Sequence, residues 1–419
     1  MFATASLVLA VFAPVPQEAP STKELEACLE AYLAAEGKTE AGRALQLEQL
    51  AIAARAEPPS ESSLKTWRKR LEKLRKKQRT LEKKSGNFHW WEEEQRGFFI
   101  VQGETKRPKG LFIGLHGGGV GSGDANTSAG SHGPAANRLD WVGIFPEVLE
   151  KTEHGWTDAG TEEWILDLIG AALRTWDIDP DQVWMGGHSM GGYGTWVLGA
   201  HHADRFAGLV PSAGAPTPIL ERDGSVVGIM DGVVPNLRNV PLVVWQSLDD
   251  VQVPPDANQA ANRAVLAARE RWGGYERYEY LEVDGFGHGL PHKGAIELLE
   301  KVADARRDAH PEKVVWQPSL PWKRQFYWLF WESPRAGALV TAELDRKANA
   351  VRVEVEGDAS GLCVLLSEEL LDVEREVALQ LNGSEVYRGV PEPNLAVWLD
   401  TAADGDPGRT YSMRVPLVR

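Results

Sequence analysis

Cysteine is almost missing from this chain, which has only Cys28 and Cys363 among its 419 residues. Two thiols so far apart indicate neither a disulfide framework nor a metal site. Long apolar runs are also missing, so no segment is expected to reach the roughly 20 residues that a membrane-spanning helix needs. Positive charge is in deficit, with 45 Lys and Arg against 60 Asp and Glu. The resulting net charge of −15 argues against a general nucleic-acid-binding protein.

The amino-acid composition is typical of packed globular domains. Hydrophobic residues make up 43% of the chain, including 16 Trp, and the length favours two or three units over one compact core. Residues 1–13 form a short apolar run before Pro14, similar to the central region of a secretory signal. We therefore predict a signal peptide at 1–20 and a secreted or periplasmic protein. The alternative is a disordered or buried N-terminus, since no Lys or Arg precedes the apolar run.

The next segment, residues 21–86, is predicted to be helical. Residues 21–56 are rich in Ala, Leu and Glu, with apolar positions at helical spacing. Residues 64–84 carry many Lys and Arg around an apolar stripe, which predicts a basic amphipathic helix in a helical hairpin. Its basic face could bind a polyanion or a membrane surface, but a solvated face over a buried stripe is the favoured interpretation. We assign this segment no chemistry.

Residues 87–312 alternate strand and helix patterns, which predicts a mostly parallel sheet covered by helices on both faces. The wholly apolar run at 111–115 is typical of a strand buried on both sides. A glycine-rich loop is expected at 121–133. Further strands are predicted at 98–101, 141–146, 183–185, 206–210, 242–245 and 278–283, and helices at 161–176, 193–200, 257–272 and 294–305.

The last segment, residues 313–419, has a different residue pattern. Aromatic residues crowd 316–331, and later runs alternate apolar and polar residues, as at 351–356. Asn382-Gly383 between two such runs is a strong hairpin signal. We predict a small antiparallel β domain of sandwich type. It could bind carbohydrate, but a structural role, capping or dimerising the preceding domain, is favoured.

The motif that organises the chain is Gly-His-Ser-Met-Gly-Gly at 187–192, between a strand pattern and a helix pattern. A Gly-x-Ser-x-Gly sequence in this setting is typical of a nucleophile elbow. Ser189 needs strained backbone angles to lift its hydroxyl above the sheet, and Gly187 and Gly191 remove side chains that would collide there.

An activated serine needs a base, a group that orients the base, and donors for the oxyanion. Asp250 follows the strand at 242–245, at the sheet edge where open α/β folds bind ligands, and Asp249 is its competitor. His288, between two glycines after a late strand, is the predicted base. The oxyanion donors are expected to be the backbone N–H of Met190 and that of Gly117 or Gly118. No phosphate-binding glycine motif is present, so nucleotide binding is set aside.

On these residues the segment 95–305 resembles the α/β-hydrolase superfamily. It is most similar to polyhydroxybutyrate depolymerases, feruloyl esterases and the catalytic domain of prolyl oligopeptidases. The motifs that carry the resemblance are Leu115-His116-Gly117-Gly118-Gly119, residues 187–192, Asp250-Val251-Gln252-Val253-Pro254 and Gly287-His288. The order of Ser189, Asp250 and His288 matches that of the family, whereas Gln246 departs from a pattern that often has histidine there. The acyl pocket is expected to include His116, His188, Trp156 and Tyr193.

The resemblance implies a serine hydrolase of carboxylic esters, with an acylated carbohydrate or a small aryl or alkyl ester as substrate and with no metal or organic cofactor. Two alternatives stay open. Prolyl peptidases share the machinery but carry a β-propeller, where this chain has about 90 mostly helical residues before the predicted hydrolase. A non-catalytic scaffold or binding protein is the other alternative, and the complete set of triad candidates argues against it.

Overall fold

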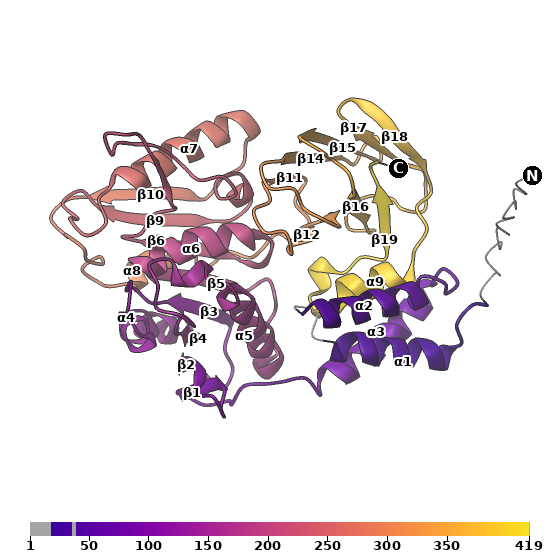
Figure 1. Ribbon diagram of the computed structural model, residues 1–419, viewed down its shortest axis with the longest axis horizontal. Coiled ribbons are helices and arrows are strands. Elements are labelled where there is room, and N and C mark those ends of the chain that lie inside the picture. Colours follow the sequence, from indigo (N-terminus) through magenta and orange to yellow (C-terminus); the bar gives the residue numbers. More distant parts are fainter. Residues whose placement is uncertain (1–17, 36–38, 419) are drawn as a thin grey trace, which may run out of the picture.

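The computed structural model describes residues 18–35 and 39–418. The predicted signal peptide, residues 1–20, therefore lies outside the described residues except for its last three. Within the described ranges no helix is long and apolar enough to cross a membrane. Figure 1 shows two bodies side by side, one built on the large sheet and the other on the small sheets together with the N-terminal helices.

The large sheet has eight strands in the order β1-β2-β4-β3-β5-β6-β9-β10. β1 and β2 are antiparallel to their neighbours, and every pairing from β4–β3 to β9–β10 is parallel. This confirms the mostly parallel sheet predicted from the alternating pattern. Its strands are β1 (Gly86–Trp91), β2 (Arg96–Gly103), β3 (Gly110–Leu115), β4 (Trp141–Pro146), β5 (Val183–His188), β6 (Gly208–Ser212), β9 (Leu242–Ser247) and β10 (Tyr278–Val283).

Helices cover both faces of this sheet, as the wholly buried β3 and β4 require. One apolar cluster joins α4 and α8 to one face, and a larger cluster joins α5, α6 and α7 to the other. The helices are α4 (Ala125–Arg138), α5 (Thr161–Trp176), α6 (Met190–His201), α7 (Asp256–Trp272) and α8 (Ile296–Leu299), with 3₁₀ turns η1 (Gly155–Thr157), η2 (Ala203–Arg205) and η3 (Pro235–Leu237).

Two sequence predictions in this region were wrong. The expected loop at 121–133 is largely helix α4, which begins where the Asp124 side chain accepts a hydrogen bond from the Thr127 N–H. Its small buried residues, such as Ala129 and Ala136, let the helix lie close on the sheet. The glycines and alanines of this segment therefore indicate a closely packed helix, and they do not indicate a loop. The helix expected at 294–305 is only the short α8 followed by turns.

The C-terminal region contains two further sheets, with orders β11-β14-β15-β17-β18 and β12-β13-β16-β19. Their pairings are antiparallel except β15–β17, and the hairpin predicted at Asn382-Gly383 joins β17 to β18. The strands are β11 (Lys313–Trp316), β12 (Gln325–Phe326), β13 (Leu329–Trp331), β14 (Leu339–Asp345), β15 (Ala350–Glu356), β16 (Leu362–Leu366), β17 (Val377–Leu381), β18 (Ser384–Gly389) and β19 (Met413–Pro416), with helix α9 (Leu395–Ala402) and 3₁₀ turn η4 (Pro407–Arg409).

The N-terminal helices are α1 (Thr22–Ala34), α2 (Glu40–Ala53) and α3 (Glu61–Arg75). The basic helix predicted for 64–84 is thus too long, because it ends at Arg75. Buried residues of these helices, including Trp67, form one apolar cluster with Trp398 and its neighbours on α9. Their packing partner is therefore the C-terminal region, as Figure 1 also shows.

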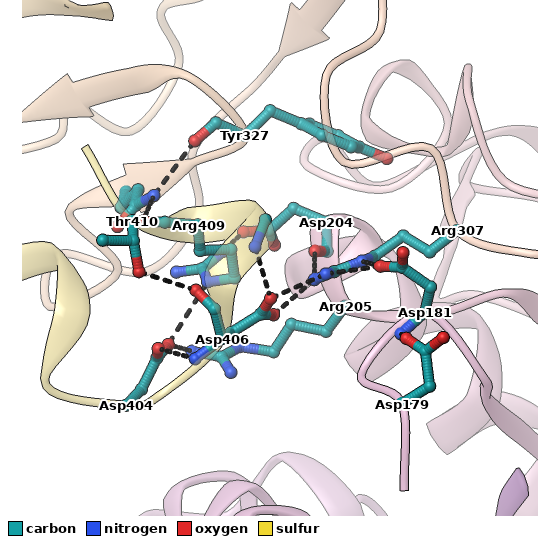
Figure 2. Close-up of polar contacts among 12 residues, drawn as sticks. Asp179, Asp181, Asp204, Arg205, Arg307, Tyr327, Asp404, Asp406, Arg409 and Thr410 are labelled. Carbon is teal, nitrogen blue, oxygen red and sulfur yellow. Dashed lines mark hydrogen bonds and ion pairs between the residues drawn. The ribbon is translucent and has the colours of Figure 1, made fainter. Parts of the chain in front are cut away.

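A buried polar cluster joins the two bodies (Figure 2). The Arg307 guanidinium, which follows the last helix of the large-sheet body, is hydrogen-bonded to both carboxylate oxygens of Asp406 beside η4. Asp204 in η2 accepts from Lys323 Nζ at 2.7 Å and also pairs with Arg409. Since such charges are stable in the interior only when paired, this cluster fixes how the two bodies meet.

Candidate active site

Ser189 lies in the sharp turn between β5 and α6. Its φ is 59° and its ψ is −123°, a strained conformation for a residue with a side chain. A Cβ at Gly187 would overlap the backbone of Gly191, and one at Gly191 would overlap the Leu115 carbonyl. The Ser189 N–H donates to the Ser212 carbonyl at 2.9 Å, which ties the turn to the end of β6. The turn thus has the geometry that the glycine pattern predicts for a nucleophile elbow.

Asp250 and His288 meet at the carboxyl edge of the sheet, from the loops after β9 and β10. The His288 Nδ1 is 2.7 Å from the Asp250 Oδ2, and the other oxygen of this buried carboxylate accepts from the N–H groups of Gln252 and Val253. An ionised carboxylate accepts only, so Nδ1 carries the proton and Nε2 is left with a free lone pair. No hydrogen bond joins the Ser189 hydroxyl to His288 in the described part of the chain.

Asp249, the competitor of Asp250, has a different position. Its carboxylate accepts hydrogen bonds from the backbone N–H groups of Gly285 and Gly287, at 3.2 and 2.9 Å. Nearby, the Trp245 indole N–H donates to the Gly289 carbonyl at 2.9 Å. Asp249 therefore holds the loop that carries His288, a role that the sequence pattern did not distinguish from that of the acid.

Gln246 is the residue that departs from the family pattern, and it is fully buried. Its amide N–H₂ donates to the carbonyls of Ser247 and Val253, both at 3.0 Å, and its oxygen accepts from Asn258 at 2.7 Å. These bonds close the base of the loop that contains Asp250. Gln246 thus supports the loop that contains Asp250. The sequence did not predict this role, because the hydrogen-bond partners of Gln246 come together only when the loop folds.

His116 supports the backbone of the predicted oxyanion loop. Its Nε2 accepts from the Val148 N–H at 3.2 Å, so its Nδ1 carries the proton and donates to the Gly117 carbonyl at 2.8 Å. Burial lowers the pKa of His116, consistent with this neutral tautomer. In a planar trans peptide, the N–H of Gly118 points away from the Gly117 carbonyl and hence away from His116.

Two of the four predicted pocket residues, His116 and Trp156, are buried in the interior and do not line the cavity at Ser189. The Trp156 indole N–H donates to the His116 carbonyl at 3.1 Å, next to the predicted oxyanion loop. Neither residue therefore lines this cavity as expected from the sequence. His116 is adjacent to the glycine motif, but that position in the sequence does not tell which side of the backbone its ring occupies.

His188 also lies outside the cavity lining. Its Nε2 is 3.2 Å from the backbone carbonyl of His288, and the two imidazole centroids are 4.7 Å apart. Burial, together with the nearby His288, lowers the pKa of His188 to about 4. The ring is therefore neutral at physiological pH and, with Nε2 protonated, donates to the loop that carries His288.

Ser189 opens into a cavity of about 530 Å³. Tyr193, the fourth predicted pocket residue, lines it, and so do Gly118 and Met190 from the predicted oxyanion hole. The hairpin of β7 (Pro218–Leu220) and β8 (Val226–Ile229) contributes Pro218 and Val226 to another wall. In the part of the chain that is described, no group of three or more His, Cys, Asp or Glu residues is placed to hold a metal ion.

Comparison with known proteins finds no matching family model and no matching curated protein. Several solved structures are similar in fold. A thermostable esterase is 18% identical over 54% of this chain and 63% of its own, with a TM-score of 0.38. A poly(3-hydroxybutyrate) depolymerase from Bordetella parapertussis is 16% identical over 49% and 85%, with a TM-score of 0.37. An acetyl xylan esterase from Aspergillus awamori is 12% identical over 49% and 93%, with a TM-score of 0.37.

All three TM-scores are below 0.5, so the fold of this chain is assigned from its own strand order. Eight strands follow the order β1-β2-β4-β3-β5-β6-β9-β10, with β2 antiparallel and a serine elbow directly after β5. This chain therefore has the α/β-hydrolase fold, which confirms the resemblance found in its sequence.

Proposed function

We propose that the protein is a serine hydrolase that cleaves carboxylic esters, with Ser189, His288 and Asp250 as its catalytic triad. The observation that carries the proposal is the strained turn at Ser189, which opens into a cavity that Gln252 and Val253 also line. The backbone N–H groups of these two residues hold the buried Asp250 carboxylate, which is paired with the half-buried His288. Strain of this kind persists where the surrounding structure enforces it, and it is typical of functional sites.

In the proposed reaction, the Ser189 hydroxyl oxygen attacks the acyl carbon of the substrate while the Nε2 of His288 takes its proton. Asp250 keeps the imidazole in the required tautomer through the 2.7 Å hydrogen bond and stabilises the imidazolium that forms. The missing hydrogen bond between serine and histidine is expected to form when substrate binds, since such contacts are often long in unliganded enzymes.

The backbone N–H groups of Met190 and Gly118 would donate to the developing oxyanion, each contributing about 3 kcal/mol of transition-state stabilisation. The alkoxide of the tetrahedral intermediate collapses, the leaving alcohol takes the proton from His288, and an acyl-enzyme remains. Water deprotonated by the same histidine then releases the acid. No step requires a cofactor.

We place esters before peptides as substrates. The described residues before the large sheet form three helices packed on α9, and they contain no β-propeller like that of prolyl peptidases. Acylated carbohydrates and small aryl or alkyl esters are the proposed substrates. The predicted signal peptide at 1–20 supports a proposal that the protein is secreted or periplasmic. The domain boundaries near 87 and 313 also stay proposals.

The test is hydrolysis of p-nitrophenyl acetate and butyrate, methyl ferulate, acetylated xylan and a proline peptide anilide. Wild type is compared with Ser189→Ala and with Ser384→Ala, a matched change at an exposed serine of β18, outside the cavity lining. Turnover of esters that is lost in Ser189→Ala and kept in Ser384→Ala would support the proposal. Cleavage of the anilide with a kcat/KM comparable to that of the esters would show that the protein is a peptidase.

Labelling with a fluorophosphonate separates these outcomes from the scaffold alternative. The proposal predicts labelling of wild type and none of Ser189→Ala, because the probe traps an activated serine. Folded wild-type protein that is neither labelled nor active would be a non-catalytic scaffold.

A further inference from the structure

The cavity at Ser189 has an uneven distribution of charge. Glu153, from the segment before η1, and Asp256, at the first position of α7, both line it and are both exposed. No Lys or Arg is among the residues that line the cavity. Neither carboxylate forms an ion pair with a described Lys or Arg. The cavity thus carries two negative charges that no cation on its wall neutralises.

Neighbouring charges do not reverse this sign. Lys151, two residues before Glu153, is 3.0 Å from Glu147 and is paired there. Arg222, in the turn of the β7–β8 hairpin, lies between Glu221 and Asp223 in the sequence, so the turn has a net negative charge. These two cations therefore do not offset the charges of Glu153 and Asp256, and the chain as a whole has a net charge of −15.

An aromatic ring adds a second feature that suits a cation. Tyr193 lines the cavity and packs edge-to-face with His154, with ring centroids 5.1 Å apart and an interplanar angle of 82°. The Tyr193 hydroxyl is 3.0 Å from Thr157 Oγ1, which holds the ring in place. An aromatic ring on the wall of a cavity can attract a positive group through its quadrupole.

We propose that this cavity selects substrates by charge, favouring esters that carry a positive group and discriminating against esters that carry a carboxylate or phosphate, with Glu153 and Asp256 as the specificity-determining residues. The inference rests on the proposed function, because it concerns the substrates of the same serine. A charged group on the substrate, several Å from a carboxylate and partly screened by solvent, interacts with that carboxylate in the transition state. Each carboxylate should therefore change the rate a fewfold.

The test uses three aryl acetates that differ in the meta substituent: a trimethylammonium cation, a neutral tert-butyl group of similar shape and a carboxylate. The kcat/KM of each is measured at pH 8 in low salt for wild type and for the double variant Glu153→Gln/Asp256→Asn. Intrinsic reactivity of the esters cancels when each charged-to-neutral ratio of the variant is divided by that of wild type. Glu270→Gln removes one negative charge from α7, roughly 20 Å from Asp256 along the helix, and is the control for a charge change outside the cavity.

The inference predicts that the cationic-to-neutral ratio falls about threefold or more in the double variant and that the anionic-to-neutral ratio rises by a similar factor. Both wild-type ratios should move towards the variant values in 0.5 M NaCl, because salt screens exposed charges. Glu270→Gln should leave both ratios as in wild type. Ratios in the double variant that match wild type would overturn the charge selection while leaving the esterase proposal intact. Absence of Ser189-dependent hydrolysis of the neutral ester would overturn the proposed function itself.

Discussion

The guanidinium of Arg307 and the carboxylate of Asp406 form a buried two-pronged ion pair between residues 99 positions apart in the chain. Arg307 also donates to Asp181 at 2.9 Å and to the Asp204 carbonyl at 2.9 Å (Figure 2). The pair thus joins η4 of the C-terminal region to the end of the α/β-hydrolase core. Its geometry leads to the first prediction.

Arg307→Ala should lower the free energy of unfolding by about 3–5 kcal/mol, because Asp406 would be left as a buried charge without its partner. Arg306→Ala is the control, since Arg306 pairs with Asp179 on the surface with about half of its side chain exposed, and it should change stability by less than about 1 kcal/mol. Urea denaturation measures both. Equal losses in the two variants would contradict a structural role for the buried pair.

Asp250→Asn should lower kcat/KM for p-nitrophenyl acetate by about 10⁴-fold at neutral pH, because the amide favours the wrong tautomer of His288. Asp249→Ala should cost much less, since it loosens the loop of His288 without changing the tautomer. Circular dichroism of both variants checks that they are folded. A larger loss in Asp249→Ala than in Asp250→Asn would exchange the proposed roles of the two aspartates.

The buried His132 predicts a dependence of stability on pH. Burial, with a contribution from His188, lowers the pKa of His132 from 6.5 to about 4. Between these values the unfolded chain binds a proton that the folded chain does not, so the stability falls as the pH drops from 6.5 towards 4. By pH 5 this loss amounts to about 2 kcal/mol for one such histidine.

Unfolding curves at pH 7.5 and pH 5 measure this difference for wild type and for His132→Gln. The variant lacks the titrating group, so its stability should decline less between the two pH values. The same decline in both proteins would show that His132 does not contribute.

The packing of α3 on α9 gives a further prediction. Leu71 is buried between the N-terminal helices and α9, so Leu71→Ala should cost about 2–5 kcal/mol of stability. Leu47 on α2 is 46% exposed, and Leu47→Ala should have an effect below about 1 kcal/mol. If the helices pack on the C-terminal region as described, limited proteolysis of Leu71→Ala should release fragments from both ends of the chain. Cleavage confined to the N-terminal helices would contradict this coupling.

The sequence by itself determined the parts of this protein that depend on local pattern. The strand at 111–115, the helix at 161–176 and the Asn382-Gly383 hairpin could be predicted because period, propensity and turn chemistry act over a few residues. The turn at Ser189 belongs to the same class, since two glycines within two residues of it are a local steric requirement. The order of the strands then allowed the positions of Asp250 and His288 to be inferred.

Only the tertiary structure decided contacts between distant segments. The hydroxyl of Tyr32 donates to Asp400 across 368 positions, and no periodic pattern indicates that α1 and α9 are neighbours. Likewise, Asp249 and Gln246 have roles set by the backbone groups that the folded loops bring to them. The rings of His116 and Trp156 are fixed by hydrogen bonds to Val148 and to the His116 carbonyl. A local sequence pattern does not show on which side of a loop a ring will lie, because that depends on how distant segments pack around it.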